Sequence, residues 1–206
     1  TALTTLNCRI NQLTSLDVSN NTSLSTFDCS DNPLTTLDVS NNTSLTYLVC
    51  HSNQLTSLDV SQNTALTTLN CRINQLTSLD VSQNSALTFL SCHNNLLTTL
   101  DVRNGNNINF TGFEVYGNSN LNCISVDNAT WATANWTNID SHTSFSNNCD
   151  KTYVPDDNFE AYLETHDASG NVVSVGDANS MGDGIANNDS VTTANISGVT
   201  SLDVNN

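Results

Sequence analysis

A 21-residue period runs through the first half of the chain and limits what it can fold into. The pattern L-x-x-L-x-C-x-x-N recurs without a slip in register, with its cysteines at Cys8, Cys29, Cys50, Cys71 and Cys92. Its asparagines follow at Asn11, Asn32, Asn53, Asn74 and Asn95. A second half-repeat, L-x-x-L-D-V, steps by the same period through Asp17, Asp38, Asp59, Asp80 and Asp101. Such a period is typical of a solenoid, in which each coil is stabilised by its neighbours.

Each half-repeat is long enough for one short strand. Because alternate side chains of a strand point to opposite faces, Leu6 and Cys8 are expected to point inward, and Thr5, Asn7 and Arg9 outward. We therefore expect a mainly β fold with two short parallel strands per coil. The two strands face each other across a thin core, and successive coils lie roughly 4.8 Å apart.

These motifs resemble the leucine-rich repeat family, whose strand signature L-x-x-L-x-L-x-x-N-x-L is matched here with Cys at the third apolar place. The alternation with L-x-x-L-D-V resembles the bacterial 21-residue class, and five repeats over residues 3–104 match it. The resemblance implies a solenoid and a binding scaffold without catalytic residues. It also implies a secreted or cell-surface protein of Bacteroidetes-like bacteria.

The repeated cysteines and asparagines, which we call ladder residues, are predicted to have structural roles. A buried thiol behaves as a small hydrophobe, and parallel strand spacing holds neighbouring Cβ atoms too far apart for a disulfide, so the five ladder cysteines are expected to be reduced. The ladder asparagines are expected to take left-handed backbone and to bond the main chain at the turns.

The repeat loosens after residue 104 but continues to residue 126. Residues 127–149, with Trp131 and Trp136, are predicted to cap the last coil. Cys123 is turned outward, and a disulfide to Cys149 is expected to hold the cap, contributing roughly 3 kcal/mol by loop closure. A disulfide indicates an oxidising environment, and therefore an extracellular or cell-surface location.

A new segment begins at residue 150. Residues 150–190 predict a helix near Pro155, with Phe159, Tyr162 and Leu163 as its apolar stripe, followed by an acidic loop. This segment resembles the N-terminal cap of secreted bacterial leucine-rich repeat proteins, although there the cap precedes the array. Residues 191–206 repeat both half-patterns and are expected to form the first coil of a second array. Bare solenoid ends also raise the alternative of a structural subunit that stacks head to tail into an extracellular filament.

Charge excludes several classes of function. The 206 residues carry 4 Lys and Arg against 20 Asp and Glu, a formal charge of −16, whereas nucleic acids and anionic membranes require a cationic surface. We predict no membrane insertion, because no stretch approaches the length of a membrane span. No catalytic triad, phosphate loop or zinc motif is present, so we expect no enzyme.

We use the name variable wall for the outward positions of the L-x-x-L-x-C half-repeats, which change from coil to coil. Aromatic and hydrogen-bonding groups together suit a protein or a polysaccharide, and we expect binding there. The alternative is drift among duplicated repeats. The candidate ligand-binding residues are Arg9, Tyr47, His51, Arg72, Phe89, His93, Glu114 and Tyr116.

The other wall, the aspartate wall, repeats an outward Asp flanked by Ser or Thr. It is read as a soluble surface, with calcium binding along the row and ice binding as alternatives. Calcium is also the candidate cofactor of the acidic loop, whose oxygen donors lack regular EF-hand spacing; a flexible polar loop is the alternative. The candidate metal ligands are Asp177, Asn179, Asp183, Asn187 and Asp189.

Overall fold

A computed structural model of the chain describes residues 2–149, 151–153, 157–169, 171–175, 178–185, 190–192 and 196. It divides into two compact units, residues 1–147 and 148–206. The first unit contains the repeats and the second contains the helix predicted near Pro155.

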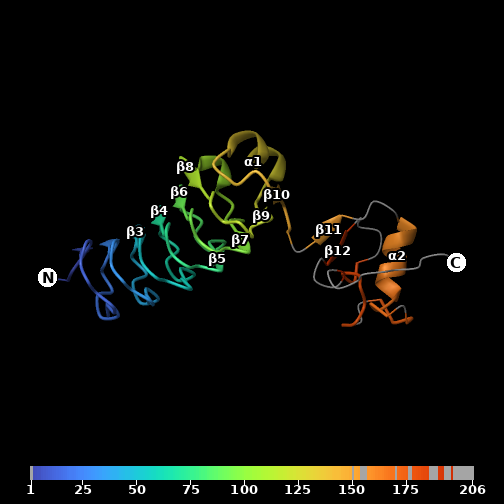
Figure 1. Ribbon diagram of the computed structural model, residues 1–206, viewed down its shortest axis with the longest axis horizontal. Coiled ribbons are helices and arrows are strands. Elements are labelled where there is room, and N and C mark those ends of the chain that lie inside the picture. Colours follow the sequence, from blue (N-terminus) through green and yellow to red (C-terminus); the bar gives the residue numbers. More distant parts are fainter. Residues whose placement is uncertain are drawn as a thin grey trace. The chain divides into compact units, whose positions relative to one another are not determined.

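One wall of the first unit is a continuous parallel sheet of six strands (Figure 1). Each three-residue strand comes from one coil and pairs in register with the next, so that Leu48 lies opposite Leu69. The sheet carries the variable wall and confirms the predicted solenoid. In spatial order its strands are β1 (Thr5–Asn7), β2 (Thr26–Asp28), β3 (Tyr47–Val49), β4 (Thr68–Asn70), β6 (Phe89–Ser91) and β8 (Gly112–Glu114).

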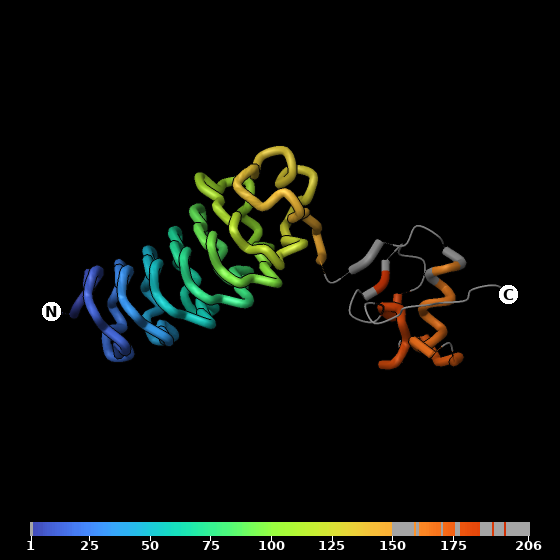
Figure 2. The backbone as a smooth tube through the Cα atoms, in the orientation of Figure 1, coloured from blue at the N-terminus to red at the C-terminus, as the bar shows by residue number. Residues whose placement is uncertain are grey.

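The opposite wall is a sheet over only part of its length. Its parallel strands are β5 (Ser78–Asp80), β7 (Thr99–Asp101), β9 (Cys123–Ser125) and β10 (Ser144–Ser146). In the first three coils, the described residues of this wall form no strand, and the coils fan out toward it in Figure 2. The continuously paired sheet therefore lies on the inner side of the curve, where solenoids present their concave surface.

The core is the predicted thin stack of Leu, Val and Cys. Cys29, Cys50, Cys71 and Cys92 are fully buried, Cys8 is half-buried, and all five are free thiols, as expected. Burial raises the pKa of Cys29 and of Cys71 to about 12, so these thiols stay neutral.

The turns differ from the prediction in one respect. The ladder asparagines do bond the main chain: Asn53 donates to Cys29 O and Cys50 O and accepts from Leu34 N. The left-handed backbone, however, falls on the residue before each asparagine and not on the asparagine itself. These residues are Ile10, Asp31, Ser52, Ile73 and Asn94, with φ between 53° and 57°. The expectation was wrong because the asparagine stabilises the turn through its side-chain amide, while the residue before it takes the left-handed conformation.

Side chains between residues 129 and 145 pack against the core at the last coil. A short 3-10 helix, η1 (Asn107–Asn109), takes up the insertion in the repeat, and α1 (Ala129–Asn135) begins at Asn128, whose side chain accepts from Trp131 N at 2.9 Å. Trp136 stacks on Phe113 with ring centroids 3.9 Å apart.

Two further features complete this end of the solenoid. Cys123 and Cys149 form the expected disulfide, since the other five cysteines are free. The cap also contributes β10, which pairs with β9 and which the sequence did not predict. One more rung is thereby added to the second sheet.

The second unit is built on α2 (Asp157–Thr165), which confirms the predicted helix, and on the antiparallel strands β11 (Lys151–Tyr153) and β12 (Ser190–Thr192). Leu163 packs with Met181 and Val191 in a small core, with Phe159 and Tyr162 beside it. Residues 193–195 and 197–206 lie outside the described residues, so the proposed coil at 191–206 stays a prediction. Across the described part of the chain, no helix has the length and apolar character of a membrane span.

Candidate functional site

The variable wall presents three columns of outward side chains that cross the six strands. The register of the sheet aligns each column, because every strand pairs with its neighbour without a shift. The first column is Thr5, Thr26, Tyr47, Thr68, Phe89 and Gly112. The middle column is Asn7, Asp28, Val49, Asn70, Ser91 and Glu114, and the third is Arg9, Ser30, His51, Arg72, His93 and Tyr116.

Main-chain hydrogen bonds hold the third column in line just beyond the strands. Ser52 N donates to Arg72 O at 3.1 Å, and Ile73 N donates to His93 O at 3.0 Å. Each coil forms one rung of the sheet, and four successive rungs therefore carry His51, Arg72, His93 and Tyr116. The ring of His93 stacks on that of Tyr116, with centroids 4.4 Å apart and planes 10° apart.

Arg72 lies half-buried between the two histidines. Within the described residues, no acceptor bonds its side chain, no carboxylate forms an ion pair with it, and its Nε is buried without a partner. Arg103, after the opposite sheet, differs: its Nε donates to Asp101 Oδ1 at 3.0 Å and its Nη2 also pairs with that carboxylate. Two other buried atoms of the wall, Asn70 Oδ1 and Ser91 Oγ, likewise have no partner.

The two histidines are favoured in their neutral form. Burial lowers the pKa of His51, and the positive charge of Arg72 lowers it further. Burial also lowers the pKa of His93, against the opposing effect of the Glu114 carboxylate. One rung separates the two histidines, so their imidazoles do not adjoin.

The aromatic residues of the first column differ in exposure. Tyr47 is 42% exposed. Phe89 is half-buried because its ring lies over Gly112, where a Cβ atom would come within 2.6 Å of Phe89 Cδ2. The glycine thus leaves room for the Phe89 ring and holds it on the sheet.

The sheet brings together most of the predicted ligand-binding residues. Glu114, His93 and Tyr116 lie at the end near the cap, with Arg72 and His51 beside them and Tyr47 and Phe89 in the first column. Arg9 is exposed in the same column as Arg72 but three rungs away, roughly 14 Å at strand spacing.

Sequence reasoning missed the residues between and beside these positions. Val49, Asn70 and Ser91 form the floor of the middle column, and Ile73 is 45% exposed at the edge of the wall. The segment C-R-I-N occurs twice, at Cys8 and at Cys71. That repetition was the available signal that Arg and Ile belong together at this edge.

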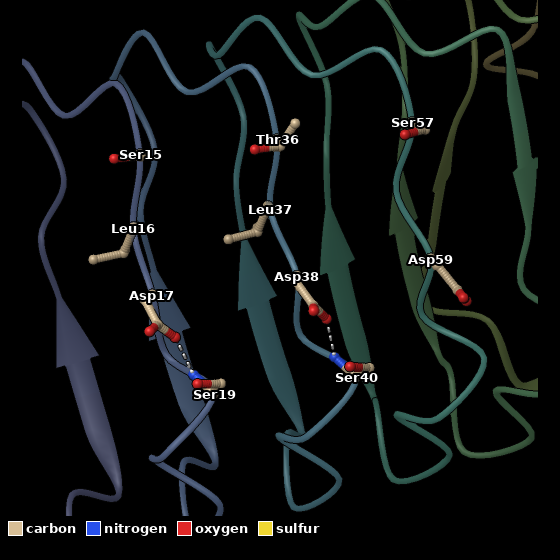
Figure 3. A pocket seen from close by; sticks show the side chains of 10 residues that line it. All are labelled: Ser15, Leu16, Asp17, Ser19, Thr36, Leu37, Asp38, Ser40, Ser57 and Asp59. Carbon is tan, nitrogen blue, oxygen red and sulfur yellow. Dashed lines mark hydrogen bonds between the residues drawn. The ribbon is translucent and has the colours of Figure 1, made fainter.

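The aspartate wall carries a shallow open groove across its first three coils (Figure 3). Asp17 and Asp38 each accept a hydrogen bond from the main-chain N–H two residues later, both at 2.9 Å. The bonds to Ser19 and Ser40 lower the pKa of these exposed carboxyls. The carboxylates are thus engaged with their own turns.

The predicted calcium ligands of the acidic loop are only partly within the described residues. Asp177, Asn187 and Asp189 lie outside them. Asn179 is exposed, and Asp183 Oδ1 accepts from Ile185 N at 2.9 Å. Across the described residues, no three His, Cys, Asp or Glu side chains converge as metal ligands would.

The buried carboxylate of Glu164, from α2, organises this loop. It accepts from Gly184 N at 2.9 Å and also from Asp183 N. This contact could not be predicted from the sequence, because a glutamate at this position is typical of the exposed face of a helix.

Two bacterial proteins are among the solved structures that are similar to this chain. No protein-family model and no curated protein matches the chain. The functional domain of InlJ from Listeria monocytogenes, described as including a cysteine ladder, is 37% identical with a TM-score of 0.54, over 60% of this chain and 31% of that one. A leucine-rich repeat protein of Leptospira interrogans is 24% identical with a TM-score of 0.50, over 60% of this chain and 37% of that one, and shows likeness of fold alone.

The chain thus spans about a third of the length of these solved structures. Leucine-rich repeat solenoids are typically non-enzymatic interaction scaffolds with an extended concave surface. The repeats, the buried cysteine ladder and the likeness to InlJ together show that the first unit is a leucine-rich repeat solenoid of coils of about 21 residues.

Proposed function

We propose that the protein is a non-catalytic recognition scaffold that binds a protein partner through the variable wall, at Tyr47, His51, Arg72, Phe89 and His93. The observation that carries the proposal is the contrast between the two walls. The continuously paired sheet gathers aromatic rings and an arginine without a counter-ion, whereas the other wall repeats the same Asp. Because tyrosine and arginine are enriched in protein interfaces, this composition favours a protein partner.

The aromatic side chains are already held for contact. Phe89 is fixed over Gly112 and His93 is stacked on Tyr116, so little side-chain freedom is lost on binding. The Cys123–Cys149 disulfide supports an exported protein that meets its partner outside the cell or at its surface.

The test is capture on an array of extracellular and cell-surface proteins, followed by affinity measurement for each captured protein. A Tyr47→Ala/Phe89→Ala variant is expected to lose at least about tenfold in affinity, because buried aromatic anchors dominate such interfaces. The matched control is Thr36→Ala/Ser57→Ala, on exposed positions of the aspartate wall.

Thermal unfolding would verify that both variants keep the fold. Equal losses in both variants, or an unchanged affinity in the aromatic variant, would reject this surface as the binding site. The same variants on a glycan array test the other ligand class: capture that depends on Tyr47 and Phe89 there would replace the protein partner with a polysaccharide.

A further inference from the structure

The variable wall contains a half-buried arginine, Arg72, that has no counter-ion among the described residues, and the exposed Arg9 of the same wall forms no ion pair there either. We propose that Arg72 is the anchoring point for a carboxylate in an acidic segment of the polypeptide partner. This inference rests on the proposed function and names the chemistry that the wall recognises.

The first argument is the set of polar atoms without partners. Arg72 Nε, Asn70 Oδ1 and Ser91 Oγ are buried and have no hydrogen-bond partner. Asn70 and Ser91 face each other in the register of β4 and β6, and Arg72 follows two residues after Asn70. Buried polar groups are nearly always satisfied in native proteins. Among the described residues, three further exceptions, the Oδ1 atoms of Asn42, Asn63 and Asn84, repeat along the turns after the aspartate wall, whereas the three here are confined to two adjoining rungs and leave Arg72 unengaged by its neighbours.

The second argument is charge. The described carboxylates near Arg72 are Asp28, Asp31 and Glu114, each two rungs away, roughly 10 Å at strand spacing and beyond ion-pair distance. The adjoining rungs carry His51 and His93, which provide no negative charge. The guanidinium is therefore uncompensated, although the chain as a whole carries a formal charge of −16.

That overall charge adds selectivity. An acidic segment is repelled by most of this protein and attracted at the few places where a cation stands free. Arg103 is not such a place, since Asp101 already pairs with it. The acidic segment is thereby directed to the variable wall.

The mode of capture follows from burial. Because Arg72 Nε is covered, the carboxylate meets the outer two nitrogens, Nη1 and Nη2, which match its two oxygens as a fork. A lysine presents a point charge without that fork, so the site distinguishes Arg from Lys.

The surroundings favour a polypeptide over a uronic acid polymer as the source of the carboxylate. Tyr47 and Tyr116 are each 42% exposed and Ile73 is 45% exposed. Apolar rings and an aliphatic side chain on the same wall as the half-buried Arg72 suit neighbouring apolar side chains of a peptide.

Two charge-matched variants, Arg72→Gln and Arg103→Gln, test the proposal in the 206-residue chain. The probe is a glutamate homopeptide, with a glutamine homopeptide as the neutral control and polygalacturonate as the uronate. Arg72→Gln is expected to weaken binding to the glutamate peptide at least about tenfold, the range of a lost charge-assisted hydrogen bond. Arg103→Gln removes the same formal charge and is expected to change the affinity less than twofold. The affinity of Arg72→Lys for the glutamate peptide is expected to lie between that of Arg72→Gln and that of the parent chain.

A second measurement uses a small carboxylate in place of a polymer ligand. In a ¹⁵N-labelled sample, sodium acetate is expected to shift the Arg72 Nε–H signal and the His51 and His93 ring signals, whereas sodium chloride at equal ionic strength leaves them in place. Equal weakening by Arg72→Gln and Arg103→Gln, or an Arg72 signal that ignores acetate, would overturn the proposal. Binding that depends on Arg72 but occurs only with polygalacturonate would overturn the polypeptide assignment.

The two proposals fail separately. An acetate-sensitive Arg72 in a chain that captures no protein refutes the proposed function and leaves the carboxylate site standing. If instead a protein is captured and its binding depends on Tyr47 and Phe89 but not on Arg72, the carboxylate site is refuted and the proposed function stands.

Discussion

The imidazole of His93 lies flat against the phenol ring of Tyr116, one rung further along the sheet, with centroids 4.4 Å apart. This stack leaves His93 only 7% exposed. Burial there lowers the pKa of His93 more than the nearby Glu114 carboxylate raises it.

Tyr116→Ala is therefore expected to raise the pKa of His93 toward its ordinary value of 6.5, because removing the ring exposes the imidazole to water. An NMR titration of the histidine ring protons measures this. Tyr47→Ala removes an equally exposed tyrosine that does not stack on a histidine and should leave the His93 titration unchanged. An unaltered pKa in Tyr116→Ala would mean that the stack does not set it.

Folding stability should depend on pH through both histidines. The charged groups facing His51 are Arg72, Asp31, Asp28 and Arg9. Since the folded pKa of His51 and of His93 lies below 6.5, the unfolded chain binds these protons more readily. The contribution of the two histidines to the free energy of unfolding is therefore complete above pH 6.5. It is lost as the pH falls from 6.5 through the pKa of each histidine in the folded state.

Urea unfolding at pH 7.5 and pH 5.5 tests this expectation. The free energy of unfolding should be lower at pH 5.5. A His51→Gln/His93→Gln variant should show a smaller difference between the two pH values. The aspartates with lowered pKa titrate below 3.8 and contribute little in this window. Equal pH dependence in the parent and the variant would contradict the assignment.

Ile73→Asn is expected to stabilise the protein by about 1 kcal/mol. Ile73 has a φ of 54°, a left-handed conformation that costs a β-branched residue roughly 1–2 kcal/mol and that Asn tolerates. The residue is 45% exposed, so the change loses little packing. Chemical denaturation provides the measurement. Ile108→Asn is the control, because Ile108 is 66% exposed without a positive φ and should give no gain.

Asn53→Ala is expected to destabilise the protein by about 3 kcal/mol. The change leaves Leu34 N without its buried acceptor and removes one of the two amide donors from Cys29 O and from Cys50 O, which keep the amides of Asn32 and Asn74. Asn11 holds the same place in the first coil but is exposed, so Asn11→Ala should cost less than about 1 kcal/mol. Equal losses of unfolding free energy would show that burial does not decide the contribution of this ladder.

Thiol labelling of the native protein should modify Cys8 first. Cys8 is half-buried, whereas Cys50 and Cys71 are fully buried with thiols whose pKa is raised by burial. Reagent uptake should therefore show one reactive thiol and four that require unfolding. Labelling of Cys71 as fast as Cys8 would mean that the ladder is not enclosed.

The sequence alone determined the coil, because its information is local and repeated. A period of 21 fixes which residues face inward, and the same Leu and Cys positions are buried from the second coil to the fifth. The disulfide between Cys123 and Cys149 was also predictable, since only these two cysteines depart from the ladder. The helix at Asp157–Thr165 followed from its apolar spacing.

Tertiary structure decided what depends on neighbours from other coils. The left-handed residue could not be assigned because both Ile73 and Asn74 lie in the turn. The fold uses Asn74 for a cross-coil bond to Cys50 O and gives Ile73 the left-handed backbone. The extra strand Ser144–Ser146 forms because β9 presents an open edge. The ion pair of Arg103 could be expected from the sequence, because Asp101 precedes it by two residues on the same face of the extended segment. Only the folded chain shows that Arg72, between two neutral imidazoles, has no counter-ion among the described residues.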